Sequence, residues 1–72
     1  MAEEILIVDD DTRLSAMLCD YLSTNGFAAR AAASAHAGLD DIRRKAPDAV
    51  ILDVMLPDLD GFETCRRIRA GS

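Results

Sequence analysis

The 72-residue sequence is poor in aromatic residues, which make up 4% of it, and it has no tryptophan. Because half of the residues are still hydrophobic, a core must be built from Leu, Ile, Val and many Ala. No apolar run approaches the roughly 20 residues that cross a bilayer. The acidic N-terminus, Met1 to Glu4, lacks the basic region of a secretion signal. The length allows one small domain or part of a larger one, and we expect it to be cytoplasmic.

Paired cysteines and an excess of positive charge are also missing. Cys19 and Cys65 have no CxxC partner, which argues against zinc or redox chemistry and favours two free thiols. The net charge of −5 argues against direct nucleic-acid binding, because phosphates require a basic surface. The basic stretches 43–45 and 66–69 fall near predicted helix C-termini, where cations oppose the helix dipole.

Two short apolar runs end in carboxylates. Residues 5–8 are followed by Asp9, Asp10 and Asp11, and residues 49–52 by Asp53. Runs of this length without alternation predict strands buried on both faces, as in a parallel sheet flanked by helices. Between these two runs in the sequence, the alanine-rich stretch 27–33, which contains Arg30, predicts a strand at the edge of the sheet.

Helical periodicity fills the gaps between these strands. The first helix is predicted to begin at Asp11 or Thr12 and to end at Asn25-Gly26. Its apolar stripe is predicted to lie in the core, and it consists of Leu14, Met17, Leu18 and Tyr21.

Two further helices are predicted. Ser34 caps the second helix, in which His36 lies at the surface without a partner motif. Asp58 or Asp60 caps the third, and both residues are predicted to be loop or cap residues rather than metal ligands.

The order strand–helix, repeated three times, predicts an α/β fold with a three-stranded parallel sheet. Right-handed crossovers with helices on both faces require the strand order 2-1-3. That order brings Asp9, Asp10 and Asp53 together at the topological switch point. Carboxylates held this close repel one another, which favours a hard divalent cation such as Mg²⁺ between them.

The acidic motifs have a further implication when they are taken together. They read Ile5-Leu6-Ile7-Val8-Asp9-Asp10-Asp11 and Ile51-Leu52-Asp53-Val54-Met55-Leu56-Pro57-Asp58-Leu59-Asp60-Gly61. The chain resembles the first three βα units of a response-regulator receiver domain of two-component signalling, which has a flavodoxin-like fold. The resemblance covers essentially the whole chain, and it rests on the joint occurrence of both motifs.

The resemblance implies a phospho-acceptor module rather than an enzyme, with at most weak self-phosphorylation. Asp53 would be phosphorylated by a sensor histidine kinase. Mg²⁺ would be held by Asp9, Asp10, Asp53 and the backbone carbonyl of Met55.

The sequence departs from the family pattern in its length. Residues 1–72 are expected to be a truncated receiver domain that lacks the fourth and fifth strands, their helices, and the Ser/Thr and Lys that end those strands. Phosphorylation would then be impaired. The third strand, central in a complete sheet, would have an open apolar edge, so we expect a homodimer. A DNA-binding output part would lie outside these residues.

Two other functions are alternatives to phospho-acceptance. The chain could be a signalling-incompetent fragment that acts only as a self-association module, as the absent Ser/Thr and Lys suggest. A Mg²⁺-dependent aspartyl phosphatase of the dehalogenase type also uses a strand-end Asp. It is disfavoured because Arg13 stands where that motif requires a hydroxyl residue.

Overall fold

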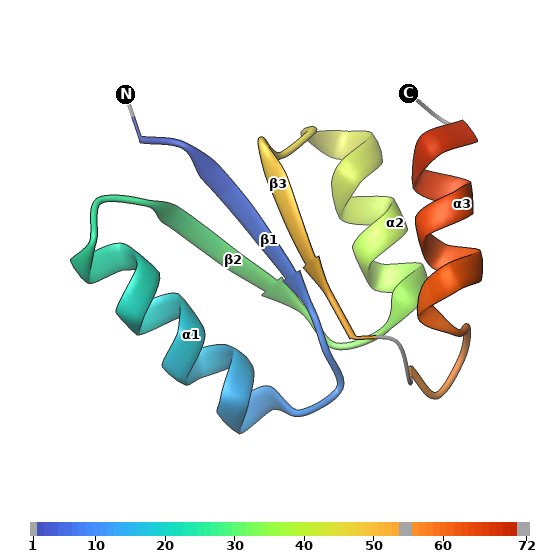
Figure 1. Cartoon of the computed structure of the whole chain (residues 1–72), viewed down its shortest axis with the longest axis horizontal. Helices are drawn as coiled ribbons and strands as arrows, with labels where there is room; N and C mark the ends of the chain where they lie inside the picture. Colours follow the sequence, from blue (N-terminus) through green and yellow to red (C-terminus); the bar gives the residue numbers. More distant parts are fainter. Residues whose placement is uncertain (1, 54–55, 71–72) are drawn as a thin grey trace.

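The computed structural model describes residues 2–53 and 56–70, in which strands and helices alternate along the chain (Figure 1). The elements are β1 (Glu4–Val8), α1 (Thr12–Thr24), β2 (Ala28–Ala32), α2 (Ala35–Arg44), β3 (Ala49–Leu52) and α3 (Gly61–Ala70). The strands are parallel in the order β2-β1-β3, which confirms the predicted topology. Figure 1 shows α2 and α3 side by side and α1 apart from them, across the sheet.

The central strand, β1, separates two apolar layers by simple alternation. Leu6 and Val8 face α2, whereas Ile5 and Ile7 face the opposite side. All four side chains are buried, because β1 has a neighbouring strand on each edge. The prediction of a strand buried on both faces is therefore confirmed for β1. It is wrong for β3, where Ala49 and Ile51 are exposed and the other two residues are half-buried, because β3 has a partner strand on one edge only in the described sheet.

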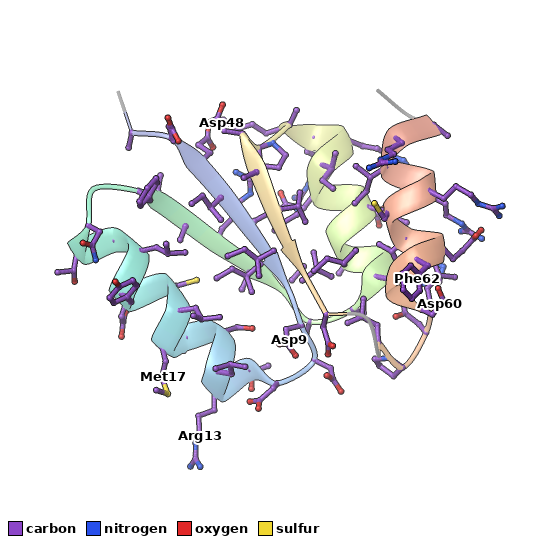
Figure 2. All side chains as sticks on the ribbon, in the orientation of Figure 1. Asp9, Arg13, Met17, Asp48, Asp60 and Phe62 are labelled. Carbon is purple, nitrogen blue, oxygen red and sulfur yellow. The ribbon has the colours of Figure 1, made fainter. Side chains whose placement is uncertain are left out.

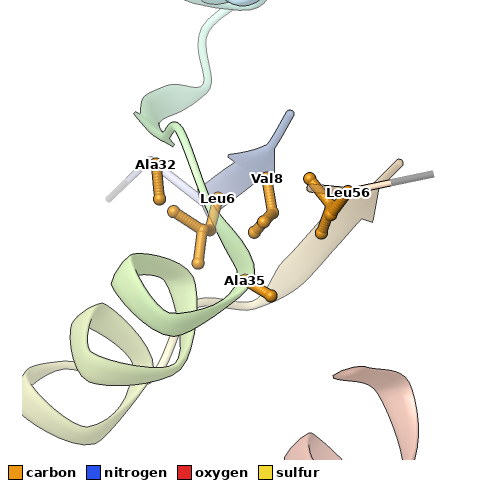
Figure 3. Packing of buried hydrophobic residues seen from close by; sticks show 5 residues of the cluster. All are labelled: Leu6, Val8, Ala32, Ala35 and Leu56. Atoms are coloured by element: carbon orange, nitrogen blue, oxygen red, sulfur yellow. The ribbon is translucent and has the colours of Figure 1, made fainter. Parts of the chain in front are cut away.

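The core on the α2 side is small and tightly packed (Figure 3). It consists of the buried side chains Leu6, Val8, Ala32, Ala35 and Leu56. Gly38 lets α2 approach the sheet, since a Cβ atom there would lie 2.8 Å from Cγ2 of Val8. Real Cβ atoms do not come so close, so this glycine is required by packing and not only tolerated in the helix.

The prediction that the α1 stripe forms core is wrong for three of its four members. Leu14, Met17 and Tyr21 are 42%, 64% and 66% exposed, and Figure 2 shows Met17 pointing away from the sheet. The side of α1 that faces the protein instead carries Ser15, Leu18 and Leu22. The helical period was correct but its phase was not. The side chains of β2, against which α1 packs, are mainly alanine. They form a shallow surface that covers only part of the apolar stripe of α1.

The caps of α1 agree with the prediction. The side chain of Asp11 accepts a hydrogen bond from the Leu14 N–H at 3.0 Å, which identifies Asp11 rather than Thr12 as the N-cap. Gly26 follows the helix with a φ of 90°, a left-handed conformation that glycine adopts without strain.

Arg30 connects the edge strand β2 to two other elements. Its guanidinium donates to Asp41 at 2.8 Å, to Glu4 at 2.9 Å and to the Lys45 carbonyl at 2.6 Å. The hydrogen bond to Asp41 is the main cause of a raised pKa for Arg30. Sequence reasoning counted Arg30 only as a sign of a weak strand, but it joins β2 to β1 and α2.

The other expectations about charge and cysteine hold for the described residues. Arg43, Arg44, Arg67 and Arg69 lie in the last turns of α2 and α3. Cys19 and Cys65 are free thiols on different helices. None of the helices in residues 2–53 and 56–70 has the length and apolar character to cross a membrane.

Candidate functional site

Two parallel strands place their terminal carboxylates at the same edge of the sheet. Asp9 follows β1 and Asp53 follows β3. The Asp53 N–H donates to the Val8 carbonyl at 2.9 Å, and the Asp9 N–H donates to the Ala32 carbonyl at 3.1 Å. These bonds continue the strand pairing by one residue at each junction, so the backbone of both aspartates is fixed by the sheet.

The structure brings Asp9, Asp10 and Asp53 into one cluster, as the strand order predicted. One carboxylate oxygen from each lies within 4.8 Å of the others. Asp9 and Asp53 are half-buried and Asp10 is exposed, so the cluster opens to solvent on one side. Figure 2 labels Asp9 at this end of the strands.

The third acidic residue of the run, Asp11, has a different role. Its side chain caps α1, and its N–H donates to Oδ1 of Asp9 at 2.9 Å. The Asp9 carboxylate is thereby oriented by the backbone of the turn. The run of three adjacent aspartates divides into two members of the cluster and one helix cap.

The cluster fits a small hard cation. Mg²⁺ binds oxygens at about 2.0–2.1 Å in an octahedron, so opposite ligand atoms are about 4 Å apart. The oxygens of Asp9, Asp10 and Asp53 already lie within 4.8 Å of one another, so at most a small closure or one bridging water is needed to meet that geometry. Met55, the fourth predicted ligand, lies outside the described residues.

The loop after Asp53 carries two more aspartates, and both are caps. The Asp60 carboxylate accepts the Glu63 N–H at 2.7 Å and begins α3. Asp58 caps α2 instead, by accepting the N–H groups of Ala35 and His36, each at 3.0 Å. Both residues are therefore caps, as predicted, although Asp58 caps α2 and not the third helix.

His36 has a partner that sequence reasoning missed. It is a surface residue, as expected, but its ring Nδ1 lies 2.5 Å from Oδ2 of Asp58. The His36 N–H, followed by the Ala35 N–H and the ring, lowers the pKa of Asp58 to about 2. No spacing rule could have found this pair, because 22 residues and two elements separate its members.

Two of the hollows in the described structure involve buried side chains or the Asp9 region, and neither contains the carboxylate cluster. The larger, of about 610 Å³, lies between α2 and α3 near the start of β3 and is lined mainly by apolar residues. A smaller hollow of about 200 Å³ lies beside Asp9 under Thr12 and Ser15. Within the described part of the chain, Ser15 Oγ is buried without a hydrogen-bond partner.

Comparison with known proteins identifies a family for this chain and agrees with its fold. Residues 5–72 match the family described as the response regulator receiver domain. Response regulator MprA of Mycolicibacterium vanbaalenii is 46% identical over 70 residues, which cover 97% of this chain and 30% of that protein. Transcriptional regulatory protein AfsQ1 of Streptomyces coelicolor is 45% identical over 65 residues, covering 90% of this chain and 29% of that protein.

Solved structures share the arrangement of the elements. A putative response regulator from Chloroflexus aurantiacus superposes with a TM-score of 0.90 at 42% identity, covering 96% of this chain and 57% of the other. The response regulator TrrA of Thermotoga maritima, solved in complex with Mg²⁺–BeF, gives a TM-score of 0.91 at 28% identity, covering 97% and 61%. Chemotaxis response regulator CheY4 of Vibrio cholerae gives 0.93 at 28% identity, covering 96% and 57%.

The extent of these matches limits what they describe. The chain spans about 30% of the length of the curated relatives and between half and two thirds of these three solved structures. Across its own length, however, the strand order, the clustered aspartates and the family match all coincide. The chain therefore belongs to the response regulator receiver domain family.

Proposed function

We propose that the chain is a Mg²⁺-dependent phospho-acceptor and that Asp53 is the residue that takes the phosphoryl group. The observation that carries this proposal is the convergence of Asp9, Asp10 and Asp53 within 4.8 Å at the carboxyl ends of β1 and β3. Residues 1–72 then correspond to the first three βα units of a receiver domain, and a sensor histidine kinase is the partner that supplies the phosphoryl group.

The residues of the cluster have separate tasks in this proposal. Asp9, Asp10, one oxygen of Asp53 and the Met55 carbonyl would hold Mg²⁺, and the ion, when bound, would offset negative charge on the phosphoryl oxygens. The second Asp53 oxygen attacks phosphorus. A new O–P bond forms as the P–N bond of a phosphohistidine breaks, and the imidazole leaving group takes up a proton.

The position of Asp53 supports this role. Its backbone is fixed by the bond to the Val8 carbonyl, and its side chain is only half-buried. A nucleophile held by a rigid strand and open on one side can meet a phosphorus atom without a large rearrangement.

The test is to incubate the chain with Mg²⁺ and phosphoramidate and to follow its mass. We expect one added phosphoryl group, labile to base and hydroxylamine, that is lost in Asp53→Asn and strongly reduced in Asp10→Asn. Asp40→Asn is the matched control, because Asp40 lies on α2 in an exposed pair with Arg43. Incorporation that persists in Asp53→Asn, or that needs no divalent ion, would contradict the proposal.

We propose self-association as the second candidate function, and the open edge of β3 favours it. β3 pairs only with β1 in the described sheet, so its other edge presents backbone donors and acceptors. Ile51, on the α1 side of this strand, is 44% exposed. An apolar edge strand of this kind is a template for pairing with a second copy of the chain.

Light scattering after size exclusion tests the second candidate. We expect a dimer at micromolar concentration that Ile51→Lys converts to a monomer. Phe62→Lys, a change of the same kind at an 80% exposed position on α3, should leave the dimer intact. A monomeric unsubstituted chain would contradict self-association and leave phospho-acceptance as the function.

A further inference from the structure

The first turn of α2 is capped by a residue from another part of the chain. Oδ1 of Asp58 accepts the Ala35 N–H, and Oδ2 accepts the His36 N–H, both at 3.0 Å. The next donor, the Ala37 N–H, is accepted by Oγ of Ser34 at 3.1 Å. The helix thus has its own N-cap and, in addition, a carboxylate from the loop between β3 and α3.

His36 strengthens this connection. Its ring Nδ1 lies 2.5 Å from the same Asp58 oxygen that accepts its backbone N–H. The Asp58 carboxylate therefore receives three hydrogen bonds from two consecutive residues at the start of α2. Hydrogen bonds to an ionised acceptor are stronger than those between neutral groups, so this is a firm attachment for a surface loop.

The loop that carries Asp58 is attached at two other points. Leu56 is 8% exposed and packs in the core with Val8. Asp60 accepts the Glu63 N–H at the start of α3. Residues 56–60 are consequently held by the core, by α2 and by α3, and only two residues separate Leu56 from Asp53.

We propose that Asp58 is a positioning residue of the Mg²⁺ and phosphoryl site. By fixing residues 56–60 to α2, it fixes the far end of the short connection that begins at Asp53. The inference rests on the proposed function, and it adds that α2 is coupled to the acceptor site through Asp58 and His36.

The alternative is that Asp58 only stabilises α2, as any N-cap would. Ser34 provides the matched control for that alternative. Ser34→Ala removes a capping bond from the same helix turn but does not touch the loop. A role in positioning therefore predicts a difference between changes at Asp58 and at Ser34, whereas a role in capping predicts that they behave alike.

The experiment measures the Mg²⁺ dissociation constant of the folded 72-residue chain by titration, with backbone amide shifts near Asp10 and Asp53 as the signal. Partners that orient metal ligands typically contribute 10–100-fold to affinity, so we expect Asp58→Ala to weaken Mg²⁺ binding about 10-fold. Asp58→Asn should have an intermediate effect, because its amide oxygen still accepts one N–H. Ser34→Ala should change the affinity less than about 2-fold, since it leaves the loop contacts in place.

Equal affinities for Asp58→Ala and the unsubstituted chain would overturn the inference, as would an equal loss in Ser34→Ala. If Asp58→Ala does not fold, Asp58→Asn and His36→Ala decide the matter, since each retains part of the connection. Wild-type affinity in both of these variants would overturn the inference. If the unsubstituted chain does not bind Mg²⁺, the proposed function and this inference are both overturned. If the chain binds Mg²⁺ and substitution of Asp58 does not change the affinity, only the inference is overturned.

Discussion

The two faces of the sheet differ in how completely they are covered. On the face of Leu6 and Val8, α2 packs on β1 and β2 with α3 beside it, and the buried β1 side chains are essentially inaccessible. On the face of Ile5 and Ile7, α1 lies over β2 and leaves Ile51 of β3 44% exposed. The same three strands therefore have one closed face and one half-open face.

The difference shows where stability and association reside. The closed face holds Gly38, Thr64 and Leu56, each packed or hydrogen-bonded at a defined position. The half-open face holds the apolar residues Met17 and Tyr21, which are mostly in solvent. It also holds the Ser15 hydroxyl, which has no hydrogen-bond partner in the part of the chain that the structure describes. Substitutions should consequently have large effects on the closed face. On the half-open face they should have small effects outside the buried β1 residues Ile5 and Ile7.

The largest contrast is expected between Leu6→Ala and Met17→Ala. Leu6 is fully buried, so its truncation should lower the free energy of unfolding by about 2–5 kcal/mol, a large share of the stability of so small a domain. Met17 is 64% exposed, and its truncation should change that free energy by less than about 0.5 kcal/mol. Urea denaturation followed by circular dichroism measures both. Similar losses would show that the two faces are equally packed.

Gly38→Ala is expected to destabilise the closed face despite the better helix propensity of alanine. The new Cβ would lie 2.8 Å from Val8, whose branched side chain cannot move away freely. Overpacking typically costs about 1–3 kcal/mol, against a propensity gain of about 1 kcal/mol. The control is Ala37→Gly at the neighbouring exposed position, where glycine should be the less stable residue. A more stable Gly38→Ala variant would mean that α2 can move off the sheet.

Two buried hydroxyl groups, one on each face of the sheet, should show the same contrast with smaller changes in stability. Thr64 is 1% exposed and donates to the Asp60 carbonyl at 2.9 Å, so Thr64→Val should cost about 1 kcal/mol. Ser15 Oγ has no partner among residues 2–53 and 56–70, so Ser15→Ala should be neutral or stabilising by up to about 1 kcal/mol. Thermal unfolding of both variants, beside the unsubstituted chain, provides the measurement. A loss in Ser15→Ala as large as in Thr64→Val would contradict this assignment.

The smallest effect is expected from acid, through Asp58. Its pKa is lowered from 3.8 to about 2, chiefly by the His36 N–H, so the folded state binds this proton less readily than the unfolded state. The resulting stability is present above pH 3.8 and is lost as the pH falls through about 2. Asp58→Asn should lose less stability than the unsubstituted chain over this interval in an acid titration followed by circular dichroism. Parallel curves for the two proteins would show that Asp58 contributes nothing to the acid response.

Much of the fold could be predicted because it follows from local patterns. The runs at 5–8 and 49–52, the cap residues Asp11 and Ser34, and the Asn25-Gly26 stop each act over a few residues. Right-handed crossovers then leave few strand orders, and the observed order β2-β1-β3 is the predicted one. The cluster of Asp9, Asp10 and Asp53 followed from that order alone.

The errors and omissions share a different physical origin. The apolar stripe of α1 specifies a helical period, but the phase at which the helix meets the sheet depends on the shape of β2, whose side chains are mainly alanine. By helix propensity alone Gly38 is only a cost to α2, whereas its contact with Val8 exists only after packing. The bonds of Asp58 to Ala35 and His36 join segments more than twenty residues apart, and no local pattern encodes them.

The sequence by itself determined which residues could become strands, helices, caps and clustered carboxylates, because those properties depend on neighbours along the chain. Only the tertiary structure decided which face of α1 is buried, why residue 38 must be glycine, and that Asp58 is attached to α2. Those outcomes depend on distances between segments, which are set when the helices settle on the two unequal faces of the sheet.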